Sequence, residues 1–238
     1  MDVMAVDDLP LPVVNFLNVI GVPWPYIDED VVSEFATLTR NFGTAVRTTH
    51  DDATGTLAAI ATVYQGASTD AMTSGWAKLS ARHVDEIVDG CHVLAGALDV
   101  AAGYIVAQKA EAVAVLVGMA AAFVADQAAA VATAGLAEAA VPLIIEGAER
   151  LVKSLVMDLQ QYVIGQVIEA AAEPLFDKIE RAMSGLDWSQ SGADVLPAGS
   201  VSLDAEALAG HVATLRTHAQ TLQQHGADYR AAIASLAF

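Results

Sequence analysis

A short break between two long apolar stripes constrains the fold of this chain more than any other feature. The break lies within residues 61–76 and centres on Tyr64-Gln65-Gly66. On both sides apolar residues recur mostly at steps of three or four, the spacing of one helix face. We therefore predict an αα-hairpin with arms of about 35 residues, each roughly 50 Å long. The stripes are formed by Val32, Phe35, Leu38, Phe42, Val46, Leu57, Ile60 and Val63, and by Met72, Trp76, Leu79, His83, Ile87, Cys91, Leu94 and Leu98.

The residues of the break have the properties of a helix–helix turn. Gly66 can adopt a positive φ, which suits a tight reversal of the chain. Ser68, Thr69 and Asp70 are candidate N-caps for the following helix. We predict that this second arm runs from about Asp70 to Gln108.

The rest of the chain predicts more helices and no strands. We expect an all-α fold in which the long antiparallel helical hairpin and additional packed helices form an elongated helical bundle. Acidic residues at 28–30 suit the start of the first arm, because the helix dipole favours them there. The predicted segments are an N-terminal proline-rich segment (1–27), the hairpin plus two apolar helical stretches (28–183), a linker (184–200) and a C-terminal heptad helix (201–238) that packs on the bundle.

Composition excludes several classes of partner. The formal net charge is −18, so nucleic acid and anionic membrane surfaces would repel the chain, whereas basic partners would attract it. Cys91 is the single cysteine, which excludes an internal disulfide framework. No Lys or Arg precedes the apolar stretch 11–20, so we expect no cleavable secretory signal.

Two tryptophans are candidate contact residues. Trp24 lies between Pro23 and Pro25, a setting that is hard to bury in regular structure, so we interpret it as a candidate partner contact. Trp76 lies on the apolar stripe of the second arm, where core packing is the simpler interpretation.

The C-terminal helix carries a second candidate site. Its seam residues Leu208, Leu215, Leu222, Tyr229 and Leu236 repeat every seven residues, as in a coiled coil. His211, His218 and His225 follow three of them at a constant offset. Imidazoles that become charged near pH 6 would weaken a helix interface, so this row is a candidate pH-sensitive face. The alternative is three ordinary histidines beside a polar seam. A shared metal site is not expected, because residues seven apart in a helix lie roughly 10 Å apart, too far to chelate one metal.

No motif in the chain indicates catalysis. The sequence lacks His-Glu-x-x-His, Cys-x-x-Cys, Gly-x-Ser-x-Gly and a glycine-rich phosphate loop. We therefore expect no enzyme activity, no cofactor and no metal site.

The two arms and the aromatic-x-Gly turn resemble the WxG helical-hairpin family exported by actinobacterial type VII (ESX) secretion systems. Tyr64-Gln65-Gly66 stands where that family has Trp-x-Gly. Trp24-Pro25, the acids that open the first arm, and the apolar stretch after the second arm are similar to a variant found at the N-terminus of secreted polymorphic toxins. That variant includes the N-terminal region of the mycobacterial outer-membrane channel protein that carries a necrosis-inducing toxin. The resemblance covers about residues 11–130.

This resemblance implies a non-catalytic export and assembly module that pairs with small WxG-type helical-hairpin proteins and is recognised by the type VII machinery. It implies that the protein is secreted or reaches the cell surface by that route. Tyr64, Gln65 and Gly66, with Trp24 and Trp76, would form the turn and partner motif. The family's export signal, Tyr-x-x-x-Asp/Glu, matches only Tyr26 to Asp30, before the first arm. We therefore expect the partner to carry the working signal.

Two other functions stay open from the sequence. Residues 111–140 and 141–172 could form a helical hairpin that inserts into a membrane as a pore or channel. Asp126 interrupts the first stretch, and its uncharged part, 112–125, is shorter than the roughly 20 residues that a bilayer requires. The third alternative is a structural spacer within a larger toxin, with neither partner binding nor membrane insertion.

Overall fold

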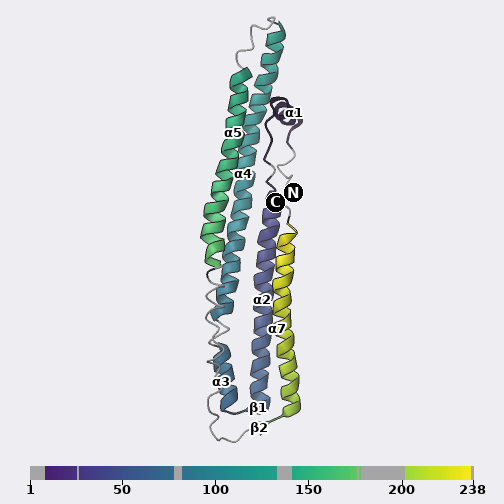
Figure 1. The fold of residues 1–238 in the computed structure, drawn as a ribbon, viewed down its shortest axis with the longest axis vertical. Helices are drawn as coiled ribbons and strands as arrows, with labels where there is room; N and C mark the ends of the chain where they lie inside the picture. The colour runs from purple at the N-terminus through teal and green to yellow at the C-terminus, as the bar shows by residue number, and fades with distance from the viewer. Residues whose placement is uncertain are drawn as a thin grey trace. The chain divides into compact units, whose positions relative to one another are not determined.

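A computed structural model describes residues 9–25, 27–77, 82–132, 141–175, 177 and 202–236. Helices make up almost all of these residues (Figure 1), so the predicted all-α helical bundle is confirmed. The predicted linker 184–200, together with Leu79 and Tyr26, lies outside the described residues. The elements in order are α1 (Leu11–Ile20), α2 (Glu29–Val63), β1 (Tyr64–Gln65), α3 (Ala67–Trp76), α4 (Arg82–Ala132), α5 (Val141–Tyr162), the π-helical segment η2 (Val163–Ala172), β2 (Ser202–Leu203) and α7 (Ala205–Ala234).

The two arms of the hairpin are α2 and the α3–α4 pair. α2 begins where the acids predicted it, because Asp28 Oδ1 accepts hydrogen bonds from the backbone N–H groups of Asp30 and Val31 at 2.9 and 3.2 Å. The second arm begins at Ala67, earlier than predicted, and α4 continues to Ala132, well beyond the predicted end at Gln108. No proline or polar break interrupts residues 109–132, so nothing in the sequence ends the helix there.

The chain divides into two compact units. Of the described residues, the first unit contains those within 9–34 and 98–168, and the second contains those within 35–97 and 169–236. Each unit therefore includes part of α2 and part of α4.

The core of the first unit is formed by α1, α4 and α5. α1 ends at Gly21, whose φ of 73° lies in the left-handed region that glycine favours. Its buried side chains include Phe16, whose ring centroid lies 5.4 Å from that of Phe123 on α4. α4 and α5 run side by side (Figure 1), with Tyr104 stacked on Tyr162 at 4.0 Å. Small and branched residues fill the space: Ala101, Ile105, Ala112, Leu116 and Ala120 from α4, and Ala148, Val152, Leu155 and Leu159 from α5.

The core of the second unit is formed mainly by α2 and the first part of α4. The helices lie close together at Gly43, where an added Cβ would lie 3.0 Å from the Cβ of Cys91. An ion pair between Arg47 and Asp85 joins the same helices at the surface. The buried apolar side chains of these two helices within the unit are Ala36, Val46, Ala53, Leu57 and Ile60 from α2, and Val88, Cys91, Leu94 and Ala95 from α4.

Candidate functional site

The aromatic-x-Gly turn is paired with a strand from the far end of the sequence. β1 and β2 form an antiparallel two-stranded ladder in which Tyr64 is opposite Leu203 and Gln65 is opposite Ser202. A strand of two residues carries no alternating pattern, which is why the sequence did not predict this ladder. The predicted motif therefore contacts a segment that lies about 140 residues away along the chain.

Gly66 does not adopt the left-handed conformation with positive φ that we predicted from the sequence. Its φ of 162° and ψ of 170° continue the extended backbone of β1, and α3 begins at the next residue. The reversal is made instead by hydrogen bonds from Thr69: its backbone N–H donates to the Gly66 carbonyl at 2.9 Å, and its hydroxyl donates to the Tyr64 carbonyl at 2.6 Å. Gly66 itself is the N-cap residue, so Ser68, Thr69 and Asp70 lie inside the first turn of α3.

α7 follows directly from β2. Its N-cap, Asp204, accepts a hydrogen bond from the Ala207 backbone N–H at 3.0 Å, as expected for an aspartate in this position. The backbone N–H of Asp204 also donates to the carbonyl of Val63, the last residue of α2, at 2.9 Å. The end of α2, the turn and the start of α7 are thus joined by backbone hydrogen bonds.

Two of the three predicted histidines contact α2. His225 Nε2 lies 3.1 Å from the Thr49 hydroxyl, and His218 Nε2 lies 3.3 Å from the Thr56 hydroxyl. The two threonines are seven residues apart on α2, and the two histidines are seven residues apart on α7, so the contact repeats after one heptad. The later histidine contacts the earlier threonine, so α7 runs antiparallel to α2. His211 has no hydrogen bond among the described residues, although it belongs to the same row. Whether the row responds to pH stays a prediction.

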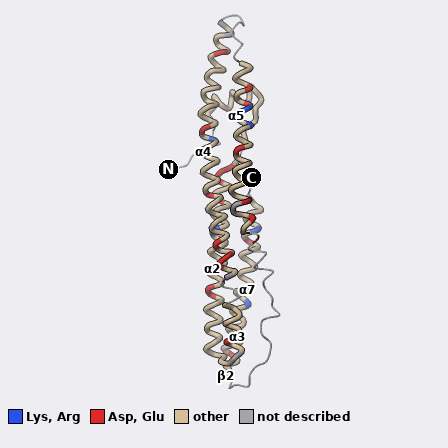
Figure 2. Tube along the Cα trace, turned by 90° about the vertical axis from the view of Figure 1, so that its left-hand side faces the viewer, with Lys and Arg blue, Asp and Glu red and all other residues tan. Residues whose placement is uncertain are grey.

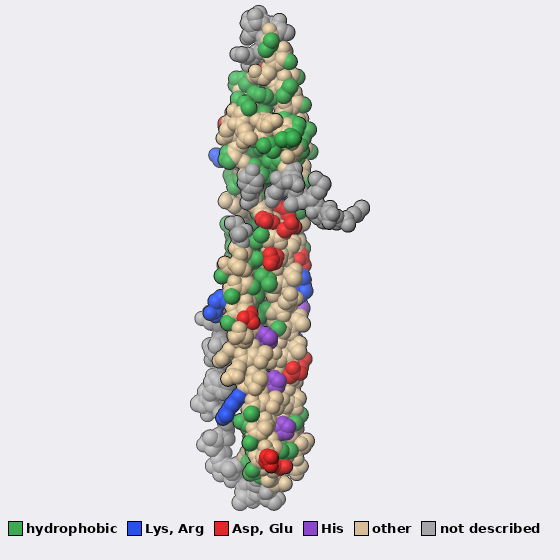
Figure 3. Space-filling model, turned by 90° about the vertical axis from the view of Figure 1, so that its right-hand side faces the viewer, with side chains coloured by type: hydrophobic (Ala, Val, Ile, Leu, Met, Phe, Trp, Pro, Cys, Tyr) green, Lys and Arg blue, Asp and Glu red, His purple; other side chains and the backbone are tan. Residues whose placement is uncertain are grey.

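Tyr229 of the α7 seam also contacts α2. Its hydroxyl lies 2.8 Å from that of Thr39, and its ring stacks on Phe42 with the centroids 4.5 Å apart. Burial raises the pKa of the Tyr229 phenol above its usual value, and the hydrogen bond to Thr39 partly opposes that rise. The helix is nevertheless held at the surface: none of its residues is fully buried, and histidine side chains are visible on this side of the molecule (Figure 3).

Trp76 lies close to the interior of the second unit. Its indole N–H donates to the Thr54 hydroxyl at 2.9 Å, and its ring stacks on the buried His50 with a centroid distance of 5.4 Å. Its role as a partner contact stays a prediction.

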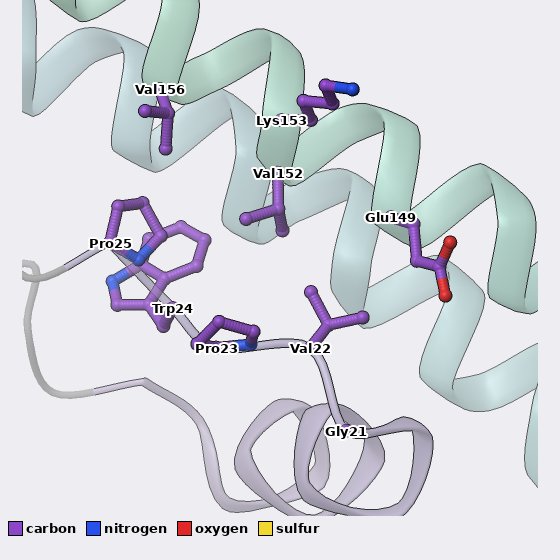
Figure 4. Close-up of a pocket in the computed structure, with 9 residues that line it drawn as sticks. All are labelled: Gly21, Val22, Pro23, Trp24, Pro25, Glu149, Val152, Lys153 and Val156. Atoms are coloured by element: carbon purple, nitrogen blue, oxygen red, sulfur yellow. The ribbon is translucent and has the colours of Figure 1, made fainter.

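Trp24 is 5% exposed, so the expectation that its flanking prolines keep it out of the core is wrong. It lies in a shallow groove of the first unit, between the Gly21–Pro25 segment and Glu149, Val152, Lys153 and Val156 of α5 (Figure 4). The two prolines keep this segment extended, and the indole lines the same groove as the α5 residues (Figure 4). Its N–H has no hydrogen-bond partner among the described residues.

Sequence reasoning missed a buried ion pair at the start of α2. Lys109 of α4 has no exposed side-chain surface, and its Nζ donates to Glu29 Oε2 at 2.6 Å and to the Ile27 carbonyl. One signal was available, because Lys109 is the only Lys or Arg between Arg82 and Arg150. A lone cation within such an apolar stretch needs a buried anion if it faces the core.

The described residues include no group of three His, Cys, Asp or Glu side chains arranged to hold a metal ion. Cys91 is buried, and burial raises its pKa to about 11, so it is a neutral thiol at physiological pH.

Comparison with known proteins identifies the helical region. A family model described as a WXG100 like domain matches residues 8–146, which contain α1, α2, the turn, α3 and α4. The match includes Trp24, Tyr64 to Gly66 and Trp76, whereas the histidine row of α7 lies outside it. No curated protein and no solved structure matches the chain.

Proposed function

Because this chain belongs to the WXG100-like family of helical domains associated with type VII secretion, we propose that it is a non-catalytic export and assembly module. It pairs with a small WxG-type helical-hairpin protein, and the two are exported together by the type VII machinery. The observation that carries this proposal is the position of the family match, which spans both arms of the hairpin and the Tyr64-Gln65-Gly66 turn between them.

The finer part of the proposal is that the module delivers a polymorphic toxin of an actinobacterium. Trp24-Pro25 and the apolar helices after the turn support this, since toxins of the mycobacterial channel-protein type share these features. The toxin's chemistry would belong to another part of the assembly, because no catalytic motif is found in this chain.

Co-expression tests the pairing. The full chain is produced together with each small helical-hairpin protein encoded beside it, and the mass of the purified species is measured after size exclusion. A stable heteromeric complex supports the proposal. A monodisperse single chain in the presence of every neighbour contradicts it. Export is tested separately, since secretion should stop when the type VII ATPase of the producing cell is inactivated.

One observation favours a second function, membrane insertion. The His83–Ala129 part of α4 is long and apolar enough to cross a membrane by length and composition alone. Its most apolar 18-residue window has a mean hydropathy of 1.8, and only 17% of that window is buried. Dye-loaded liposomes distinguish the two functions: a pore former built on residues 111–172 releases the dye at pH 7.5 or 5.5, whereas an export module does not.

A further inference from the structure

An apolar strip on α4 is exposed along the whole first unit. It consists of two rows of residues seven apart, one from Val100 to Ala128 and one from Gly103 to Val131, which we call the α4 strip. All ten positions are Gly, Ala or Val, and all ten are exposed. The valines are far from buried, with exposed fractions of 62% for Val100, 66% for Val124 and 85% for Val131. Hydrophobic side chains are visible at the surface of this unit in Figure 3.

We propose that the α4 strip is the surface on which the helical-hairpin partner docks. This inference rests on the proposed function and adds to it the place of contact and the chemistry of the partner. The spacing is the first argument. Alternating steps of three and four residues repeat without a break from Val100 to Val131, and a strict seven-residue repeat keeps one face of a helix against another helix over many turns. Glycine and alanine at these positions allow the second helix to approach closely.

The dimensions of the strip fit a hairpin better than a single helix. At the rise and width of an α-helix, the strip is about 45 Å long and about 10 Å wide, so it offers roughly 450 Å². That is about half of what one partner contributes to a stable interface. A second exposed row, which includes Val115, Gly118 and Ala122, lies about a third of a turn around the same helix. The second helix of a hairpin can cover this row.

Charge argues against a bilayer as the occupant. Asp99 and Glu111 are exposed on this part of α4, and one carboxylate oxygen of Asp126 is buried with no hydrogen-bond partner among the described residues. Between Glu111 and Asp126 only fourteen residues, 112–125, are uncharged. A bilayer core needs about 20 such residues, and carboxylates within it are costly.

Charge also argues against a second copy of this chain. Within residues 98–132 every exposed charged side chain is acidic, and the single cation, Lys109, is buried against Glu29. Acidic residues also outnumber Lys and Arg in α2 and α5 (Figure 2), in line with the net charge of −18. Two copies would place like charges beside the strip, whereas a partner with Lys or Arg flanking its own apolar row would be attracted. We therefore assign the strip to a hairpin with small apolar residues at heptad spacing and basic flanks.

The α7 side of α2 offers no comparable open surface. In the second unit α7 already lies along α2 through Thr39, Thr49 and Thr56. A partner that used this face would have to displace α7, whereas the α4 strip is uncovered by any described residue.

The test is a pair of matched double variants of the full chain. Val117→Glu with Val124→Glu places two charges on the strip. Leu143→Glu with Met157→Glu places the same charges at exposed apolar positions of α5, where the exposed fractions are 70% and 50%. All four positions are exposed, so both variants should keep the circular dichroism and melting temperature of the parent chain. The probe is the neighbouring hairpin protein that forms the complex with the parent chain.

The strip variant should bind this hairpin at least ten-fold more weakly, and the α5 variant should bind like the parent. Equal binding by all three chains would overturn the inference and leave the proposed function standing. If no neighbouring hairpin binds the parent chain, the proposed function itself fails. Self-association of the parent chain, or its binding to phosphatidylcholine–phosphatidylglycerol vesicles, would also overturn the inference if the strip variant abolishes it, because a second copy or a bilayer would then be the occupant.

Discussion

Lys109 Nζ lies 2.6 Å from Glu29 Oε2, and both side chains are almost completely shielded from water. The pair joins the first turn of α2 to the middle of α4, and the Ile27 carbonyl shares the same ammonium group. Ile27 and Glu29, which follow Trp24-Pro25 in the sequence, are therefore held to α4 by this ammonium group.

Replacing Lys109 with Met should destabilise the chain by about 3–5 kcal/mol, because Glu29 would be left buried without its counter-charge. Lys109→Met combined with Glu29→Leu should recover most of this loss, since an apolar pair of similar volume removes the unpaired charge. Urea denaturation of the two variants measures the difference. A double variant no more stable than the single one would show that the pair is not the cause.

Gly43 and Gly55 offer a matched comparison within α2. A Cβ at Gly43 would lie 3.0 Å from the Cys91 Cβ, whereas nothing lies within 4 Å of a Cβ at Gly55. Gly43→Ala should cost about 1–3 kcal/mol through overpacking. Gly55→Ala should gain about 0.5–1 kcal/mol, because alanine loses less backbone entropy in a helix. Thermal or urea unfolding should therefore show changes of opposite sign, and changes of the same sign would contradict the close approach of α2 and α4.

Tyr229 predicts how stability changes at alkaline pH. Burial raises the pKa of its phenol above 10, so the folded state favours the protonated form. Its contribution to stability is complete below pH 10 and is lost as the pH rises through the folded-state pKa. Tyr229→Phe keeps the stacking on Phe42 but has no titrating group, so its melting temperature should fall less steeply than that of the parent between pH 9 and 11.5. Cys91, with a pKa of about 11, contributes in the same direction in both proteins, and its charge adds to the rise in the pKa of Tyr229.

Replacing His218 and His225 with Ala should loosen α7. Each variant removes one hydrogen bond to a threonine of α2, worth about 1 kcal/mol, and amide hydrogen exchange in residues 205–234 should become faster. His211→Ala is the control, because this histidine of the same row has no such bond among the described residues. The same experiment at pH 7.5 and 5.5 tests the pH-sensitive face, provided that each exchange rate is divided by the intrinsic rate at that pH. Unchanged protection factors in α7 would remove that hypothesis.

Gly66→Val separates folding from recognition at the turn. The extended backbone of Gly66 is compatible with a β-branched residue, so the melting temperature should change by little. If the aromatic-x-Gly turn is recognised by the partner, the variant should lose the complex in co-expression while it stays folded. Unfolding of the variant would instead show that Gly66 is needed for the turn itself.

The sequence predicted the helices well because their signal is repeated many times. The apolar spacing from Val32 to Val63 and the acids at residues 28–30 located α2 to within a residue or two. Single-residue features were less informative. The geometry of Gly66 depends on pairing with β2, about 140 residues away, and the burial of Trp24 depends on α5. Neither contact leaves a local pattern. The α4 strip was present in the sequence as a heptad repeat, but only the structure shows that this face of α4 is exposed rather than the buried one at Ile105 and Leu116.

The repeated spacing between α2 and α7 leaves an ambiguity that the turn resolves. Threonines and histidines both recur after seven residues, so sliding α7 by one heptad, about 10 Å, would pair His218 with Thr49 and His211 with Thr56. If only the histidine–threonine contacts are considered, the two alignments have nearly the same energy. The β1–β2 ladder selects the observed alignment, because only one residue separates β2 from α7. α7 cannot slide unless β2 loses its hydrogen-bond partners in β1. Inserting a single residue at Asp204 should therefore rotate α7 by about 100° and remove both histidines from α2. The length of this junction thus determines which face of the C-terminal helix contacts α2.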